Sequence, residues 1–199
     1  MPISALKVLE LNEFLKSQGK PPLVEGLCER ELNNPEGCGL DLRVGEVYKL
    51  KGNGFLGVED RKTPEVEKID CVNNKIVMFP NEYFLVKTME TIHSPAEKIR
   101  LYPWWKFWES KKYLMPVIYP RSTLQNCGIE LIATKTDPGY IGQLRFGLKN
   151  IGLAKFDFEP GARMFNIVFE PVIGEIKRAY EGQWQGGKRA STKGFEKQN

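Results

Sequence analysis

The sequence predicts a mainly β protein, either an antiparallel sandwich or a barrel-like domain. Short segments that alternate apolar and polar residues recur along the chain, with Gly, Pro and Asn between them. GxxxxGK[ST] does not occur, which argues against a P-loop fold. A chain of 199 residues is long enough to bury the core of one domain.

The N-terminus is the exception to the β pattern, since residues 4–18 are expected to form a helix. Ser4 can cap its start and Gly19 can end it. The expected apolar stripe consists of Leu6, Leu9, Leu11, Phe14 and Leu15. The charged residues 23–34 have room for a short second helix. From residue 39 onward the pattern is β, and the expected strands include 40–44, 47–50, 76–79, 83–86, 114–119, 129–132, 144–148 and 165–169.

Two segments depart from this pattern. Residues 174–199 carry six basic and three acidic residues and many glycines, so we expect a flexible basic tail after a single β domain of residues 1–173. Residues of about 101–112 form an insertion that contains Trp104, Trp105 and Trp108. These tryptophans can pack on the core or on another subunit, or they can form a lid or a base-stacking platform.

Composition excludes several kinds of site. The four cysteines lack CxxC spacing and the single histidine is His93, so neither a protein-ligated zinc nor a histidine triad is expected. No run of about 18 apolar residues and no signal-peptide pattern appears, so we expect a cytoplasmic protein without a membrane partner. The net charge of +4 lies largely in the tail, which can bind nucleic acid or close over a nucleotide.

The segment TDPGYIG at residues 136–142 is the strongest functional signal. Pro138 and Gly139 predict a type II turn that holds the Asp137 carboxylate rigidly. Upstream, Arg121, Ser122 and Thr123 offer a guanidinium and two hydroxyls, which suit phosphate. Together these groups predict an enzyme that acts on a phosphorylated small molecule.

The chain resembles the superfamily of dUTP diphosphatases and dCTP deaminases. The matching blocks follow the family order from about residue 6 to about residue 194: 39–45 (GLDLRVG), 80–90, 120–124 (PRSTL), 136–150, 160–169 and 180–186 (YEGQWQG). The resemblance implies a distorted jelly-roll protomer in a homotrimer, with active sites between subunits and a C-terminal tail that closes over the nucleotide. It also implies Mg²⁺ carried by the triphosphate of the substrate.

The superfamily's two activities require different residues. Its deaminases use a glutamate ten positions after the motif aspartate and an arginine five positions after the Arg-Ser pair begins; here these positions are Gly147 and Asn126. Glycine cannot transfer a proton, so the sequence favours hydrolysis of dUTP to dUMP and pyrophosphate. A dCTP deaminase, possibly bifunctional, and a catalytically silent nucleotide-binding trimer remain alternatives. A nucleic-acid-binding module is weaker, and no stable nucleic-acid partner is expected.

The resemblance also implies roles for individual residues. Asp137 would contact the deoxyribose 3′-OH and orient water toward the α-phosphorus, while Tyr140 would pack under the deoxyribose. Asp41 would lie near the hydrated Mg²⁺, reached only through water. The other expected substrate-binding residues are Arg121, Ser122, Thr123, Arg163, Gln185, Lys188, Arg189, Ser191 and Thr192. Arg163 can equally be a salt-bridge partner at the end of a strand, and Lys188 and Arg189 stand where the hydrolases usually have an aromatic residue.

Overall fold

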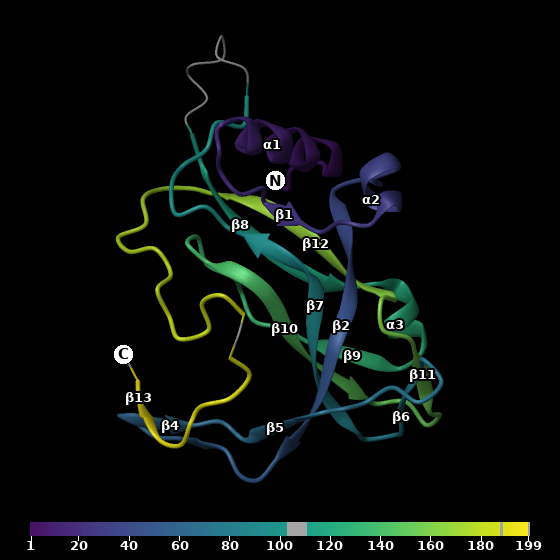
Figure 1. Ribbon diagram of the computed structural model, residues 1–199. Coiled ribbons are helices and arrows are strands. Elements are labelled where there is room, and N and C mark those ends of the chain that lie inside the picture. The colour runs from purple at the N-terminus through teal and green to yellow at the C-terminus, as the bar shows by residue number, and fades with distance from the viewer. Residues whose placement is uncertain (103–110, 188, 199) are drawn as a thin grey trace.

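A computed structural model describes residues 1–102, 111–187 and 189–198. One curved antiparallel sheet dominates it, and the order of its main strands is β8-β12-β2-β7-β10-β9 (Figure 1). These strands are β8 (Tyr113–Pro120), β12 (Arg163–Val172), β2 (Gly39–Lys51), β7 (Tyr83–His93), β10 (Ile141–Asn150) and β9 (Ile129–Ile132). The short strands β1 (Val24–Glu25) and β5 (Glu65–Lys68) pair with β7 and β2. The predicted mainly β class is therefore confirmed.

The core lies on one face of this sheet, because the strands alternate buried and partly exposed residues. In β7, the even-numbered positions from Phe84 to Ile92 are buried and most odd-numbered ones are only partly so. Phe146 of β10 and Phe165 of β12 meet in the core with ring centroids 5.0 Å apart. The odd-numbered side chains of β7 and β10 are thereby left on the opposite face, where a ligand can reach them.

The N-terminal helix α1 (Ala5–Ser17) forms as predicted, with the Ser4 side chain accepting a hydrogen bond from Lys7 N. Its buried face differs from the expected stripe: Leu6 and Phe14 are 63% and 52% exposed. The buried residues are Ala5, Val8, Leu11, Asn12 and Leu15. The buried Asn12 explains the orientation, because its side chain accepts from Leu23 N and donates to Val24 O, which ties the helix to the chain entering β1. A stripe chosen by hydrophobicity alone misses this polar anchor.

The remaining elements are short. They are α2 (Glu29–Asn33), α3 (Ser122–Asn126), β3 (Phe55–Leu56), β4 (Asp60–Lys62), β6 (Ile76–Met78), β11 (Phe156–Phe158) and β13 (Glu196–Lys197). The strands expected at residues 76–79 and 83–86 both form, and the first of them, β6, pairs with β11. Near the C-terminus, β13 pairs with β4, so the tail folds back across the protomer (Figure 1).

Trp104, Trp105 and Trp108 lie outside the described residues, and so does Lys188. Among the described residues, no helix has both the length and the apolar character required to cross a membrane.

Candidate functional site

A cavity of about 310 Å³ opens beside the turn that was singled out in the sequence. The loop before β10 and the strand itself form one side, Leu85 of β7 contributes to the floor, and the tail forms the other side. The lining residues are Leu85, Thr134, Lys135, Thr136, Asp137, Tyr140, Gln143, Leu144, Arg145, Phe146, Tyr180, Trp184, Arg189 and Ala190. Three expected site residues, Asp137, Tyr140 and Arg189, therefore meet here.

The Pro-Gly turn has the predicted geometry. Gly139 has φ +102°, and Tyr140 N donates to Asp137 O at 3.2 Å across the turn. Gly139 N also donates to Ser94 O at 2.7 Å, which fastens the turn to the end of β7. A Cβ on Gly139 would lie 2.7 Å from Tyr180 N, so only glycine allows this approach of the tail. The turn is thus held from both sides.

Asp137 presents its carboxylate at the mouth of the cavity. Its side chain is 39% exposed, and Oδ1 accepts a hydrogen bond from Lys135 Nζ at 2.8 Å. The second oxygen accepts no hydrogen bond from any described residue. A carboxylate that is fixed at its backbone and still open to solvent can accept a proton from water or a hydrogen bond from a hydroxyl.

Tyr140 forms an apolar wall of the cavity. Its ring is buried and meets Tyr180 edge to face at 5.8 Å, and its hydroxyl donates to Gln143 O at 2.7 Å. Burial raises the pKa of Tyr140 to about 12, so the phenol stays neutral at physiological pH. The residue is therefore suited to packing against an uncharged ring.

The tail lines the cavity and is attached to the rest of the protomer through backbone and side-chain hydrogen bonds. Gly186 N donates to Ile141 O at 2.7 Å, and the Gln185 amide accepts from Ile141 N and donates to Gly139 O. Further along, Thr63 N donates to the Thr192 hydroxyl at 3.0 Å, and Thr192 N donates to the Thr63 hydroxyl at 2.8 Å. Ser191 is partly buried beside Thr192. Gln185 and Thr192, both expected to bind substrate, thus hold the tail to the body of the protomer in this structure.

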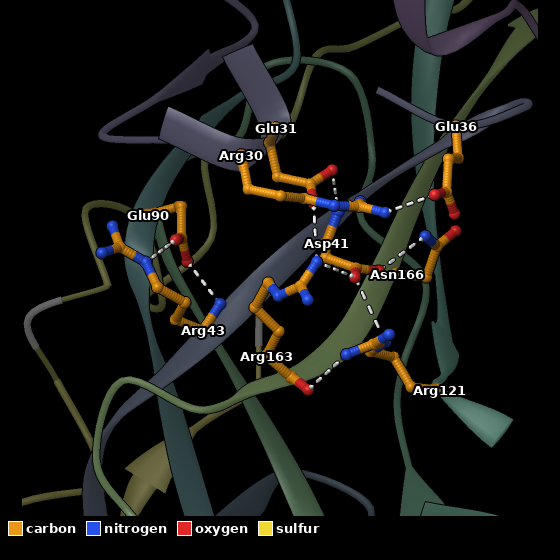
Figure 2. Close-up of polar contacts among 9 residues, drawn as sticks. All are labelled: Arg30, Glu31, Glu36, Asp41, Arg43, Glu90, Arg121, Arg163 and Asn166. Atoms are coloured by element: carbon orange, nitrogen blue, oxygen red, sulfur yellow. Dashed lines mark hydrogen bonds and ion pairs between the residues drawn. The ribbon is translucent and has the colours of Figure 1, made fainter. Parts of the chain in front are cut away.

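A second group of expected residues gathers elsewhere, around Asp41 (Figure 2). Asp41 Oδ2 accepts from Arg121 Nε and from an Arg163 terminal nitrogen, both at 3.1 Å, and Oδ1 accepts from Asn166 Nδ2 at 3.1 Å. Arg121 also donates to Arg163 O at 3.4 Å. Two guanidinium groups therefore converge on a single carboxylate.

Sequence reasoning missed the residue behind this cluster, Glu31 of α2. It is completely buried, and its carboxylate accepts from Asp41 N at 3.0 Å, Arg163 at 3.2 Å and Arg30 at 2.6 Å. Figure 2 shows Glu31 above Asp41, on the side opposite Arg121. Nothing in the local sequence signals this role, since α2 is separated from β2 by a loop and the contact depends on the packing of the helix.

The two groups of residues line separate cavities. Arg121, Ser122 and Asp41 line one of about 320 Å³, and this cavity shares no residue with that of Asp137. Thr123 and Arg163 line a neighbouring hollow. In Figure 1, α3, which follows Arg121 directly, lies on the opposite side of the view from the yellow tail. One protomer therefore presents two incomplete halves of the expected site.

The described residues include no group of three or more His, Cys, Asp or Glu side chains that could hold a metal ion. Both Asp41 oxygens already accept hydrogen bonds from Arg121, Arg163 and Asn166. This donor set does not fit a cation bound directly by the protein, because Mg²⁺ requires free oxygen ligands. It fits the phosphate groups that would carry such a cation.

Gly147 of β10 faces a position that another side chain already fills. A Cβ built there would lie 2.3 Å from the hydroxyl oxygen of Tyr83, on the neighbouring strand β7. Tyr83 is half-buried, and this burial raises its pKa. A glutamate at position 147 would not fit beside Tyr83 in this arrangement.

Comparison with known proteins agrees with the arrangement of these elements. The family model described as "dCTP deaminase-like" matches residues 107–172. The chain is 29% identical over 149 residues to a probable deoxyuridine 5′-triphosphate nucleotidohydrolase of Aeropyrum pernix, covering 75% of this chain and 83% of that protein. The chain is therefore similar to both the dUTP diphosphatases and the dCTP deaminases.

Both branches of the superfamily occur among its relatives. A dCTP deaminase of Pyrococcus furiosus is 29% identical over 170 residues, covering 85% of this chain and 88% of the relative. The crystal structure of 2′-deoxycytidine 5′-triphosphate deaminase from Agrobacterium tumefaciens has a similar fold, with a TM-score of 0.56 at 15% identity. That match covers 84% of this chain and 47% of the other. The expected jelly-roll architecture is thereby confirmed, and the choice between the two activities depends on the site.

Proposed function

We propose that the protein is a dUTP diphosphatase, which hydrolyses dUTP to dUMP and pyrophosphate. The observation that carries the proposal is the Asp137 carboxylate, fixed on its turn at the mouth of a cavity with Tyr140 as an apolar wall. The relatives named as dUTP nucleotidohydrolases support the same reaction. Gly147 and Tyr83 argue against deamination. Position 147 of β10 carries no acidic side chain where deamination would require one, and Tyr83 fills the space beside it.

In the proposed reaction, Asp137 contacts the 3′-OH and orients a water molecule toward the α-phosphorus. As the water oxygen bonds to this phosphorus, the carboxylate accepts its proton, and the bond to the oxygen bridging the α- and β-phosphorus breaks. Pyrophosphate leaves with the bond electrons. Tyr140 packs under the deoxyribose, where a 2′-OH would be crowded. Cations around the phosphates stabilise the charge that develops.

Arg121 and Arg163 are proposed to supply part of that positive charge, with Ser122 and Thr123 as hydroxyl donors. Mg²⁺ bound to the triphosphate would neutralise further phosphate charge and would reach Asp41 only through water. Gln185, Lys188, Arg189, Ser191 and Thr192 belong to the tail that is proposed to close over the nucleotide.

Because Asp137 and Arg121 line different cavities of one protomer, we propose that the site is completed between subunits of a homotrimer. In this arrangement the Asp137 side of one subunit faces the Arg121 side of another. We further propose that the protein acts in the cytoplasm on free nucleotides, without a stable nucleic-acid or membrane partner.

Product analysis with Mg²⁺ and either dUTP or dCTP tests the proposal. We expect pyrophosphate and dUMP from dUTP and no ammonia from dCTP. Asp137→Asn should lower kcat for dUTP by about 10²- to 10⁴-fold, because the proton acceptor is lost. The thermal midpoint should change little, because the pair with Lys135 that is also lost is exposed. Asp157→Asn is the matched control, since Asp157 forms a similar pair with Lys155 outside the cavity.

Three results would contradict the assignment. Full activity of the Asp137→Asn variant would show that another group activates water. Ammonia release from dCTP by the wild-type protein would favour the deaminase alternative. That alternative is supported by the description of the matching family model and by the Pyrococcus furiosus relative. Nucleotide binding without pyrophosphate release would support a silent binding protein.

A further inference from the structure

Arg145 of β10 places a positive charge in the wall of the Asp137 cavity. Its Nε is buried and has no hydrogen-bond partner, while one terminal nitrogen donates to the Arg189 carbonyl oxygen of the tail. Among the described residues, no Asp or Glu forms an ion pair with Arg145; Asp137, the one acidic residue of the lining, is paired with Lys135. A buried N–H without an acceptor is costly and uncommon in folded proteins. The Arg145 guanidinium therefore has more donors than the described residues around it accept.

The position of Arg145 within the cavity indicates which part of a nucleotide would provide that acceptor. Tyr140 directly precedes β10, and its hydroxyl donates to the carbonyl oxygen of Gln143. Arg145 lies two residues after Gln143 on the same strand. If Asp137 and Tyr140 hold the sugar, as the proposed function requires, the base extends from them toward Arg145. In a pyrimidine, the atom attached to the sugar is N1 and C4 lies across the ring from it. The group on C4 is then the part of the base nearest to Arg145.

The chemistry of the guanidinium distinguishes the pyrimidines. Arginine has five N–H donors and no acceptor. Uracil carries a carbonyl oxygen on C4, which accepts hydrogen bonds, whereas cytosine carries an amino group there, which donates them. A cytosine in this orientation would leave donors facing one another inside a cavity that is largely apolar on the sides of Leu85 and Phe146.

We propose that Arg145 is a specificity-determining residue that selects 4-keto pyrimidine nucleotides over 4-amino ones. The inference rests on the proposed function, because that function orients the nucleotide. It also connects recognition of the base with closure of the tail. The guanidinium that would bind the base also donates a hydrogen bond to the Arg189 carbonyl oxygen of the tail.

The test compares the wild-type protein with Arg145→Met, which removes the donors while keeping an unbranched side chain. The kcat/KM for pyrophosphate release is measured with dUTP and with dCTP. We expect the wild-type preference for dUTP to fall by about tenfold or more in the variant, the scale of one lost base-specific contact. Lys149→Met is the matched control: Lys149 lies on the same strand, donates to Asn81 O outside the cavity, and should leave the preference unchanged.

A second measurement separates this inference from the proposed function. Calorimetric titration of the Asp137→Asn protein, with and without Arg145→Met, compares binding of dUMP and dCMP without any turnover. Selective binding of dUMP that Arg145→Met abolishes supports the role of Arg145 even if no pyrophosphate is ever released. Should Arg145→Met fail to fold, Arg145→Lys takes its place and should reduce the preference partly, because an ammonium group lacks the planar set of donors.

Two outcomes overturn the inference. If both substrates lose kcat/KM by the same factor, Arg145 acts on the phosphates or only through the tail. If the wild-type protein binds dUMP and dCMP equally well, the guanidinium does not read the base.

Discussion

Asp137 owes its position to the residues that surround its turn. Pro138 and Gly139 set the backbone, and Ser94 and the tail hold the turn in place, so the carboxylate is fixed before any ligand arrives. A catalytic group that is already in position does not lose conformational entropy during the reaction. At Gly147 a neighbouring side chain occupies space instead of holding a functional group in place. Tyr83 of β7 fills the space that the missing side chain of Gly147 leaves on β10.

We predict that Gly147→Ala destabilises the protein by about 1–3 kcal/mol, because the new methyl group would overlap the phenol of Tyr83. Backbone strain is not the cause, since the φ angle of Gly147 lies outside the positive region. Urea unfolding monitored by circular dichroism measures the change. In a Tyr83→Leu background the same substitution should cost clearly less, and an equal cost in both backgrounds would show that the two residues do not interact.

At the level of the elements, β2 connects the parts of the molecule that surround the site. Its N-terminal half carries Asp41, which forms an ion pair with Arg163 of β12. Its C-terminal half carries Glu46, which forms ion pairs with residues of β5 and β7. The Glu46 carboxylate accepts from Lys87 and Lys68 at 2.9 Å each and from the Tyr48 hydroxyl at 2.8 Å. These contacts hold three neighbouring strands by side chains in addition to the backbone ladder.

We predict that these Glu46 contacts are lost in acid. The Lys87 ammonium, followed by Lys68 and Tyr48, lowers the pKa of Glu46 to about 2 from its ordinary value of 4.5. A folded-state pKa below the unfolded one means that the stabilisation is complete above pH 4.5 and disappears as the pH falls toward 2. The side chain is 37% exposed, so solvent screening limits the effect to about 1 kcal/mol or less.

Urea midpoints between pH 7 and pH 2.5 provide the measurement. Glu46→Gln should make the protein less stable at pH 7 and should reduce the decline in stability on acidification. Glu67→Gln is a suitable control, because Glu67 on β5 pairs with Lys51 and both side chains are more than half exposed. A decline on acidification that is identical in the wild type and Glu46→Gln would exclude Glu46 as a source of acid sensitivity.

For the whole molecule, the important feature is the separation of the two groups of residues that are proposed to form one site. The buried Glu31 fixes Asp41 and Arg163 on one side, and the Pro-Gly turn fixes Asp137 on the other. Each half is held by its own hydrogen bonds, and no described residue lines both cavities. An assembly that joins one half to the other half of a neighbour would complete the site without rearrangement of either.

Mixed assemblies test this arrangement directly. Asp137→Asn and Arg121→Met proteins, each nearly inactive alone, should regain activity when they are unfolded together and refolded. Random mixing in equal amounts places two intact halves together in about a quarter of the sites, which sets the expected recovery of dUTP hydrolysis. Asp137→Asn mixed with Asp137→Ala is the control and should stay inactive. If the first mixture also stays inactive although mixed assemblies form, each site belongs to a single subunit.

Patterns within short stretches of sequence were sufficient for much of this protein. Alternating residues indicated the β class, Ser4 and Gly19 bracketed the N-terminal helix, and Asp137 stood out because a Pro-Gly turn is encoded by adjacent residues. The pairing of β6 with β11 could not be predicted, since hydrophobic alternation defines a strand without naming its partner. The same limit applies to the orientation of the first helix, which a buried Asn12 determines.

Only the tertiary structure revealed Glu31, Arg145 and the contact between Tyr83 and Gly147. Each depends on side chains from elements far apart in the sequence, brought together when the sheet curves and the tail folds back over it. Burial also changes their chemistry, because a carboxylate or guanidinium removed from water must find partners inside the protein. The sequence therefore determined which groups exist, and packing decided which of them meet.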